Sequence, residues 1–484
     1  TPWVREAQNE SERKRRIATL FEVKRMEAEL GKAVKKLKGM QVSSGGWAWF
    51  EVMPVDRYMT QYITAGFGKL FKLGIRSFAD DAEMVRGALG FLDREIRKDY
   101  DELLRAEREG RLKMSDNNLG ALQVHYLYMR SFYKDEAMDA GEREAFDYYK
   151  GQAVKFWNGR GWYQMGMIAL ALSRYGDAGT AEGIVRSLRE NALYSEELGM
   201  YWKENAGGYY WYEAPIETQA LLIEVFDEVG KDEKSVDDMR VWLLKNKQTN
   251  DWKTTKATVE AVYALLLRGE DWLAGETLVD VRVGGIDVMK DVKPEAGTGY
   301  FKASWKWGDV KNDMGNVTIS RKSARGISWG ALYWQYFEDL DKITGSETGL
   351  SLEKKLFVVE ETASGEVISP IGELKVGDKV RVRIVLRSDR AMEYVHMKDM
   401  RAAGFEPVSV MSGYKYKDGL GYYESTRDAA TNFFFGYLPK GTFVFEYDLR
   451  VNLAGDFSNG ITSIQCMYAP EFSSHSEGVR VLVK

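Results

Sequence analysis

Residues 43–70, SSGGWAWFEVMPVDRYMTQYITAGFGKL, carry the pattern that decides the fold of the first half of the chain. A glycine pair leads into two tryptophans, a loop closed by Pro54 and then a helix. The same order recurs before helical stretches at residues 161–163, 207–212 and 251–252. Units repeated in this way bury their apolar faces against their neighbours. The repeats therefore predict an array of packed helices.

Helical periodicity extends from about residue 45 to residue 270, and Gly74, Gly176 and Gly230 stand where helices are expected to end. Paired helices with short connections, and aromatic residues at one recurring end, favour an α/α toroid over an open bundle. Polar side chains at matched helix positions would lie along one rim, where such residues more often fix loops than contact a ligand. These side chains are Thr60, Gln61, Thr218, Gln219 and Thr258. The expected helices span residues 56–73, 79–98, 116–133, 141–157, 161–175, 178–192, 214–229, 234–246 and 254–268, after a charged helix within residues 1–40.

At about Trp272 the apolar pattern changes from helical to alternating, which predicts a small β unit over residues 272–342. Residues 343–348 are expected to be a linker. Strands in the β unit are expected at residues 278–285, 300–307, 316–321 and 328–337.

Residues 349–484 read as all-β, and the number of short strands separated by turn signals is typical of a β-sandwich. The predicted fold is thus a multidomain α plus β chain: a toroid over residues 1–271, a small β unit and a terminal antiparallel sandwich. The expected sandwich strands span residues 352–360, 379–387, 394–400, 422–425, 432–437, 441–452, 463–467 and 479–484.

The composition of the chain limits the classes of partner that it is expected to bind. The 484 residues include 68 basic and 73 acidic side chains, well mixed, for a net charge of −5. This balance argues against nucleic acid or an anionic membrane surface as a partner. No apolar run approaches the ~18 residues of a membrane span, and one cysteine, Cys466, excludes an intrachain disulfide. The chain opens at Thr1 without a methionine, and we expect it to be a processed chain or a piece of something longer.

Few residues point to chemistry by themselves. The three histidines lie far apart, without metal-ligand spacing, so neither a metal nor another cofactor is expected. His125, on a predicted helix, is a candidate general base, although a packing histidine is the commoner case. Cys466, between Ile464 and Met467, reads as a buried structural thiol.

Carboxylates beside aromatic residues are what a glycan-active enzyme needs. Glu204 and Glu213 flank the aromatic run at residues 209–212, and Glu51 and Asp56 follow the two tryptophans. The recurrence of the aromatics in each repeat favours packing, because a catalytic site would occur once.

The terminal half also carries an ordered series of motifs. They are GLSLEK at 349–354, LKVGDKVRV at 374–382, KDMRAAGFEP at 398–407, LPKGTF at 438–443 and MYAPE at 467–471. This series resembles the closing domain of bacterial alpha-2-macroglobulins. GGWAWF at 45–50 and WKTT at 252–255 resemble the thioester-domain toroid of that family, and the small β unit looks like the CUB-like part that follows it.

The resemblance implies the C-terminal part of a non-enzymatic protein that inhibits endopeptidases by trapping them. In that family a thioester from a Cys-x-Glu-Gln motif couples to the peptidase, and a tyrosine of the last domain shields the thioester. That tyrosine would be Tyr468, with Met467, Pro470 and Glu471 completing its motif. This chain has no Cys-x-Glu-Gln, so the motif lies upstream of Thr1 or this member has none. Tyr468 then either keeps its shielding role or serves only to dock the domain.

The resemblance further implies endopeptidases and upstream domains as partners, and a periplasmic or cell-envelope location with a lipid anchor outside this chain. Two alternatives remain open at this point: a glycan-active toroid enzyme of lyase or glycosidase type, and an envelope interaction scaffold. In the second, the toroid rim would present an aromatic partner surface made of Trp47, Trp49, Trp211, Tyr212 and Trp252.

Overall fold

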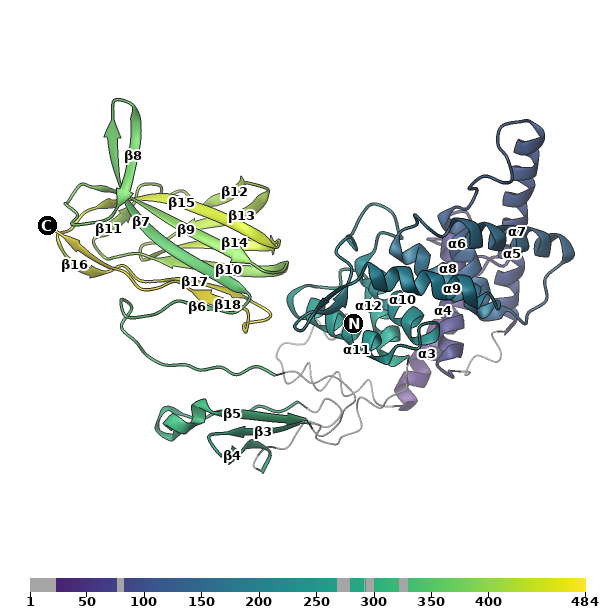
Figure 1. Cartoon of the computed structure of the whole chain (residues 1–484), viewed down its shortest axis with the longest axis horizontal. Helices are drawn as coiled ribbons and strands as arrows, with labels where there is room; N and C mark the ends of the chain where they lie inside the picture. Colours follow the sequence, from purple (N-terminus) through teal and green to yellow (C-terminus); the bar gives the residue numbers. More distant parts are fainter. Residues whose placement is uncertain (1–22, 76–81, 268–278, 291, 293–299, 322–329) are drawn as a thin grey trace. The chain divides into compact units, whose positions relative to one another are not determined.

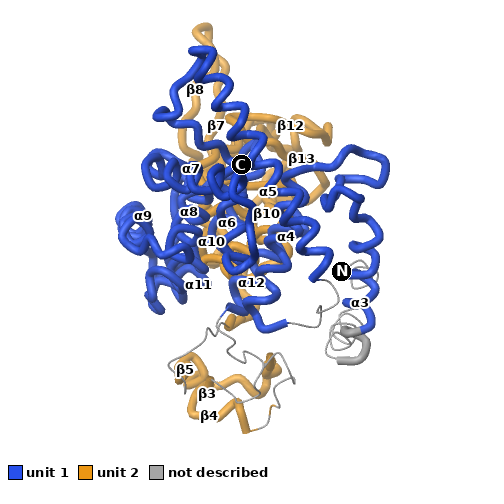
Figure 2. The backbone as a smooth tube through the Cα atoms, turned by 90° about the vertical axis from the view of Figure 1, so that its right-hand side faces the viewer, with its two compact units in different colours: residues 1–241, 254–272 blue, residues 242–253, 273–484 orange. Residues whose placement is uncertain are grey.

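The computed structural model describes residues 23–75, 82–267, 279–290, 292, 300–321 and 330–484. The chain forms a helical region followed by β domains (Figure 1). It divides into two compact units, residues 1–241 with 254–272 and residues 242–253 with 273–484, and each is considered by itself (Figure 2). Within the described ranges, no helix combines the length and apolar character that a membrane crossing requires.

The helices follow the predicted order closely. After α3 (Val23–Met40) and the glycine–tryptophan loop, they alternate along the chain with short connections, and a small hairpin of β1 (Leu193–Ser195) and β2 (Gly199–Tyr201) precedes α10. Residues 1–22, where the first charged helix was expected to begin, lie outside the described ranges. The remaining helices are α4 (Arg57–Lys72), α5 (Ala82–Arg108), α6 (Ala121–Arg130) with the 3₁₀ turn η3 (Ser131–Tyr133), α7 (Ala140–Phe156), α8 (Trp162–Arg174), α9 (Ala178–Glu190), α10 (Pro215–Glu228), α11 (Glu233–Thr249) and α12 (Thr255–Leu266).

Burial separates inner from outer helices. In α8 residues 163–172 are all buried, and in α10 residues 216–226 are all buried, so both helices are covered all round. By contrast, α9 buries only Ala181, Ile184, Val185 and Leu188, a single face at helical spacing. Helices α4, α6, α8, α10 and α12 pack in succession, with α5 against α4, α7 against α5 and α6, and α9 against α8. An ion pair between Lys69 of α4 and Glu260 of α12 joins the first and last inner helices and closes the α/α toroid.

The helix boundaries differ most from the sequence prediction at α5 and α6. Helix α5 was expected to end at residue 98 but continues to Arg108, with Tyr100 and Ala106 buried on its inner face. Helix α6 was expected from residue 116 but begins at Ala121. Asn118 explains the later start, because its backbone N–H donates to Gln152 and its amide donates to the Tyr148 hydroxyl, so α7 side chains hold this segment outside the helix.

The small β unit has a sheet of order β4-β3-β5, built from β3 (Val279–Val283), β4 (Ile286–Asp287) and β5 (Val317–Arg321). Its core is Val283, Val288 and Met314. The strand expected over residues 300–307 is wrong, since residues 300–306 pair with no ladder in the described structure and Trp307 begins a short 3₁₀ turn. The strand expected over 328–337 is likewise absent from residues 330–337, where Leu332, Tyr333, Trp334, Tyr336 and Phe337 are exposed. Alternating aromatics misled the prediction at both places; residues 328 and 329 lie outside the described ranges.

The terminal β-sandwich packs two antiparallel sheets face to face, as the alternation predicted. One sheet has the order β12-β13-β14-β10-β17-β18-β6, the other β11-β15-β9-β7-β8, and β16 pairs with β19. The predicted linker contributes β6, whose Ser346 and Glu347 pair with β18. The strands are β6 (Ser346–Glu347), β7 (Leu350–Thr362), β8 (Gly365–Pro370), β9 (Lys379–Ser388), β10 (Met392–Met400), β11 (Phe405–Pro407), β12 (Gly413–Lys417), β13 (Leu420–Thr426), β14 (Ala430–Leu438), β15 (Gly441–Val451), β16 (Gly455–Ser458), β17 (Thr462–Cys466), β18 (Ser473–His475) and β19 (Arg480–Val483).

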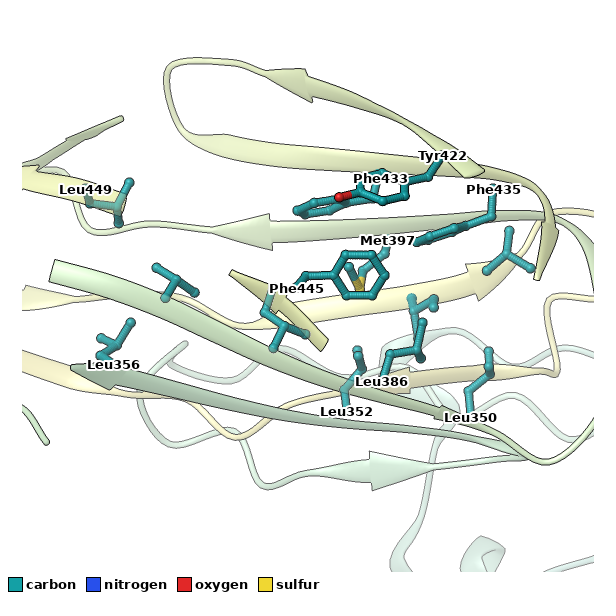
Figure 3. Close-up of a cluster of buried hydrophobic side chains, with 14 of the residues drawn as sticks. Leu350, Leu352, Leu356, Leu386, Met397, Tyr422, Phe433, Phe435, Phe445 and Leu449 are labelled. Carbon is teal, nitrogen blue, oxygen red and sulfur yellow. The ribbon is translucent and has the colours of Figure 1, made fainter. Parts of the chain in front are cut away.

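Alternate side chains of the two sheets fill the sandwich core. In β9, Val380, Val382, Ile384 and Leu386 point inward while the residues between them are less buried. Aromatic rings from the two sheets meet in the middle, where the Phe445 ring centroid lies 5.3 Å from that of Phe433 (Figure 3). Edge-on and tilted aromatic pairs of this kind add stability beyond the apolar area that they bury.

Candidate functional site

The turn between β17 and β18 contains residues 467–471, the motif singled out in the sequence. The Cys466 N–H donates to the Phe472 carbonyl at 2.9 Å, and the Phe472 N–H donates to the Ala469 carbonyl at 2.9 Å. Cys466, Ala469 and Phe472 are buried in the sandwich core. The turn is therefore anchored from beneath, while Met467 and Tyr468 on its tip are 57% and 78% exposed.

Tyr394 of β10 supports this turn. Its carbonyl accepts the Met467 N–H at 2.9 Å, and its ring lies edge-on to Tyr468 with centroids 5.3 Å apart. Tyr394 also has a φ of 55°, in the left-handed region that bulky residues rarely occupy. Such backbone strain costs about 1–3 kcal/mol and persists where surrounding contacts impose it. Tyr468 is thus presented by a defined, strained support.

Cys466 is a buried thiol, as predicted. Its Sγ lies 3.5 Å from the Glu393 carbonyl, and burial raises the pKa of the thiol above its ordinary value. A protonated, enclosed thiol is a poor nucleophile. The sole cysteine of the chain is therefore a core residue of the sandwich.

A second cluster lies inside the toroid, where aromatic rings surround the ammonium group of Lys256. The ring centroids of Tyr58, Tyr62, Tyr163 and Trp211 lie 5.8, 5.7, 5.5 and 5.6 Å from its Nζ. Cations at such distances are attracted to the faces of aromatic rings. We call Lys256, these four aromatic residues and the adjacent His125 the axial cluster.

Partial burial changes the ionisation of the groups in the axial cluster. Burial raises the pKa values of Tyr58 and Tyr62 well above those of free tyrosine, and the Glu260 carboxylate adds to the shift. Burial likewise lowers the pKa of Lys256, although Glu217 and Glu260 oppose it. The cluster is therefore a set of packed neutral rings around one partly buried cation.

His125 belongs to this packing. Its Nδ1 lies 3.0 Å from the Gln61 amide nitrogen, which also donates to the Leu122 carbonyl, so Nδ1 is the acceptor. Burial, together with the positive charges of Lys256, Lys69 and Arg57, lowers the pKa of His125 to about 3. A neutral, enclosed imidazole fits the packing interpretation rather than a general base exposed to a substrate.

The predicted aromatic rim is not one surface. Trp47 is 1% exposed, and its indole N–H donates to the Leu37 carbonyl at 2.9 Å, so its place on a partner surface is corrected: it packs the helix-entry loop. Trp49 is half exposed beside Tyr58, whereas Trp211 turns into the axial cluster with Tyr212 edge-on to it. Trp252 stands in the connection from α11 to α12. The Lys247 ammonium lies 5.9 Å from the centroid of the Trp252 ring.

The rim polar groups and the acidic candidates mostly hold loops. Asp56 caps α4 by accepting the Met59 N–H at 2.7 Å, and Glu213 accepts the Tyr210 N–H at 3.0 Å. Gln219 donates to the Met200 carbonyl at 2.8 Å, tying the β1–β2 hairpin to α10. Among the described residues, no group of His, Cys, Asp and Glu side chains is arranged to hold a metal ion.

Sequence reasoning missed Lys256 and the two tyrosines of α4. The available signal was the i, i+4 spacing of Tyr58 and Tyr62, which places both rings on one helix face. Lys256 gave no signal, because a lysine in the first turn of a helix is usually solvated.

The comparison with protein families decides the identity of the terminal domain. Residues 349–471 match the family model described as the bacterial alpha-2-macroglobulin MG10 domain. Residues 349–471 are thus a domain of the bacterial alpha-2-macroglobulin MG10 type. The resemblance of the terminal motifs is thereby confirmed, and the turn that carries Tyr468 lies at the end of the MG10 match.

Solved structures of the family are also similar to the chain. They include "Escherichia coli alpha-2-macroglobulin activated by porcine elastase", at 13% identity and TM-score 0.39 over 92% of this chain and 37% of that one. "Crystal structure of Salmonella alpha-2-macroglobulin reacted with methylamine" matches at 15% identity and TM-score 0.34, over 92% and 27%. The E. coli fragment from domain MG7 to the C-terminus matches at 13% and 0.33, over 95% and 68%. These TM-scores are low, and the assignment rests on the MG10 match. No curated protein sequence matches the chain.

Proposed function

We propose that this chain is the C-terminal part of an alpha-2-macroglobulin-type protein that inhibits endopeptidases by entrapment. The observation that carries the proposal is the MG10 match, which ends on the outward turn bearing Met467 and Tyr468. The chain spans 37% and 29% of the first two similar structures. A bait segment, upstream domains and the complete trap would, on this proposal, belong to a larger protein. On this proposal the toroid is thioester-domain-like, the protein has no enzyme activity of its own, and it lies in the periplasm or cell envelope on a lipid anchor outside this chain.

The chain itself supplies no thioester. It contains no Cys-x-Glu-Gln, and its one cysteine is enclosed in the MG10 core. Covalent capture would therefore need a cysteine upstream of Thr1. In that case Tyr468, exposed on its own domain and held by Tyr394, is the residue we assign to shielding. Without an upstream thioester, the trap would be steric.

The test uses the full-length protein mixed with a panel of endopeptidases of different specificity. We expect protection of large protein substrates from the bound peptidase, with small peptide substrates still cleaved. A peptidase-containing adduct that survives denaturing electrophoresis would indicate a covalent trap, and protection without an adduct a steric one. Full cleavage of large substrates by every peptidase would overturn the proposal.

Tyr468→Ala, with Tyr468→Phe as its matched control, tests the shielding role in the same protein. If an adduct forms, Tyr468→Ala is expected to react with a small amine before any peptidase is added. The phenylalanine variant keeps the ring and should stay closer to the wild type. Equal reactivity of Tyr468→Ala and the wild type would leave Tyr468 a docking residue only.

An interaction scaffold is the second candidate, favoured by a row of rings on the outer face of the MG10 seven-stranded sheet. Tyr414, Tyr423, Phe434 and His396 are successive cross-strand partners on β12, β13, β14 and β10. Their neighbouring centroids lie 5.0, 6.5 and 4.7 Å apart. Exposed apolar patches of this kind often mark contact surfaces. Absence of inhibition, together with loss of an envelope complex on changing Tyr414 and Phe434 to serine, would put the scaffold first.

A further inference from the structure

A lysine and an aspartate face each other across the interior of the MG10 sandwich. Lys354 stands on β7 between the core residues Leu352 and Leu356, and Asp399 stands at an inward position of β10. The two strands belong to opposite sheets. The Lys354 Nζ lies 2.7 Å from the Asp399 Oδ1, and the two side chains are 1% and 0% exposed. This pair is therefore an inter-sheet contact without access to water.

The Asp399 carboxylate is held by further donors. The Thr462 hydroxyl donates to Oδ1 at 2.6 Å, and the Tyr447 hydroxyl donates to Oδ2. Lys354 also donates to the Met400 carbonyl at 2.7 Å, which fixes its Nζ beside the carboxyl group. Both reacting groups are thus immobilised at contact distance, the condition under which intramolecular reactions reach high effective concentrations.

We propose that Lys354 and Asp399 are an autocatalytic isopeptide site, at which the lysine amine and the aspartate carboxyl condense to an amide. One proton passes from the ammonium to the carboxylate, giving the amine and the carboxylic acid. The amine nitrogen attacks Cγ, the Nζ–Cγ bond forms, and the Cγ–Oδ2 bond breaks. Oδ2 leaves as water with one proton from the carboxylic acid and one from the amine, so the step needs no oxidant or other reactant.

Tyr447 is assigned the part of the hydrogen-bond donor that assists the leaving oxygen. Its hydroxyl contacts Oδ2, the oxygen that departs. Burial and the neighbouring Asp399 raise the pKa of Tyr447 well above that of a free tyrosine, so the phenol stays protonated. Its hydrogen bond then stabilises the negative charge that develops on Oδ2 as the Cγ–Oδ2 bond breaks.

The product keeps the contacts of Met400 and Thr462 with less buried charge. The amide N–H keeps the Met400 carbonyl as its acceptor, and the retained Oδ1 keeps the Thr462 hydroxyl. Tyr447 loses Oδ2 as its acceptor, and its oxygen keeps the hydrogen bond from Thr431. Two buried charges are replaced by one neutral amide, which removes the desolvation penalty of the ion pair.

The bond would tie the two sheets covalently in a chain whose single cysteine rules out an intrachain disulfide. The inference is independent of the proposed function, because it concerns the interior of one domain. It adds a modification site to a domain that, on the proposed function, meets peptidases.

The test is the intact mass of the purified full chain, denatured and compared with the mass calculated from the sequence. We expect a deficit of one water molecule, and a branched peptide joining Lys354 to Asp399 after proteolysis and fragmentation. Lys354→Arg is the matched control, because its guanidinium keeps the ion pair but does not condense under these conditions. This variant should show the full calculated mass, and Tyr447→Phe should lose the deficit or acquire it more slowly.

One other reaction also lowers the mass by one water molecule, and the Lys354→Arg control distinguishes it from the condensation. Asp418-Gly419 can lose water to form a succinimide, but that loss would persist in Lys354→Arg and would map to residues 418–419. A wild-type chain at full calculated mass after prolonged incubation, or a deficit unchanged in Lys354→Arg, overturns the proposal and leaves an ion pair.

Discussion

The ammonium group of Lys256 lies 5.6 Å from the ring centroid of Trp211 and 3.4 Å from the Trp211 carbonyl oxygen, to which it donates. This relationship joins α12 to the loop before α10, a loop whose Tyr209 and Tyr210 are exposed. One partly buried cation therefore holds a surface loop over the interior of the toroid.

A double-mutant cycle measures this contact. Lys256→Met and Trp211→Leu, singly and together, are expected to give a coupling free energy of about 1–2 kcal/mol in denaturant unfolding, because the cation is shielded from water. The control is the exposed Lys155 with the partly buried Phe156, whose ring lies 4.7 Å from the ammonium, and this pair should couple by less than about 0.5 kcal/mol. Equal coupling in the two pairs would show that burial adds nothing.

Because of His125, we expect the helical unit to become less stable in acid. Burial, with Lys256, Lys69 and Arg57, lowers its pKa to about 3 in the folded state, below the ordinary value of 6.5. The unfolded chain therefore binds the proton first, so the free energy of unfolding falls as pH drops from about 6.5 toward 3. The loss from pH 7 to pH 4 is about 3 kcal/mol, at about 1.4 kcal/mol per pH unit.

The measurement compares the wild type with His125→Gln in urea at pH 7 and pH 4. The variant starts less stable, because it leaves a poorer fit between Gln61 and Tyr58, but its additional loss at pH 4 should be smaller by about 3 kcal/mol. His475→Gln, on the sandwich, controls for the change of residue type. An identical pH dependence in the wild type and His125→Gln would contradict the prediction.

Much of this could be foreseen from the sequence, for local reasons. Helices whose apolar residues fill the whole circumference, as in α8, and strands that alternate strictly, as in β9, declare themselves through spacing. The axial cluster could not be foreseen, because Tyr58, Trp211 and Lys256 meet only when the toroid closes. Trp47 shows the converse: a tryptophan beside a glycine pair looks like a rim residue until its N–H is found on the Leu37 carbonyl. The turn that carries Tyr468 could be foreseen from its motif. Nothing in the sequence indicated that Tyr394 supports this turn.

We expect the replacement of Glu224 to cause the largest loss of stability in the toroid. Burial alone would raise its pKa, but Arg174, Lys72 and Lys69 hold it at about 2, and the hydroxyls of Tyr128 and Tyr263 donate to it at 3.0 Å. Glu224→Gln leaves Arg174 with a weaker partner in a dry site, and we expect a loss of about 3–5 kcal/mol. The Glu228 carboxylate contacts Arg174 and Lys72 at 25% exposure, so Glu228→Gln should lose less. Calorimetry at neutral pH makes the comparison; a larger loss for Glu228→Gln would refute it.

We expect position 394 to tolerate glycine unusually well for a position within a strand. Tyr394→Gly relieves the strain of a φ of 55° while removing the contact with Tyr468, so the MG10 domain should stay within about 1 kcal/mol of the wild type. Tyr394→Val has a branched side chain unsuited to this φ and should be less stable than the glycine variant by about 1–2 kcal/mol. Chemical unfolding of the two variants decides, and a valine variant as stable as the glycine variant would mean that the backbone there is unstrained.

The ion pair between Lys69 and Glu260 also sets an order of events during synthesis. The partners are 191 residues apart, whereas each inner helix otherwise packs on the next along the chain. Successive helices can assemble as they leave the ribosome, since such near-neighbour contacts form quickly. The ring itself stays open until α12 has emerged, so a chain stalled before residue 255 exposes an unpaired Lys69 and the open side of α4. A nascent toroid is therefore most vulnerable to proteases and chaperone capture just before its last helix arrives.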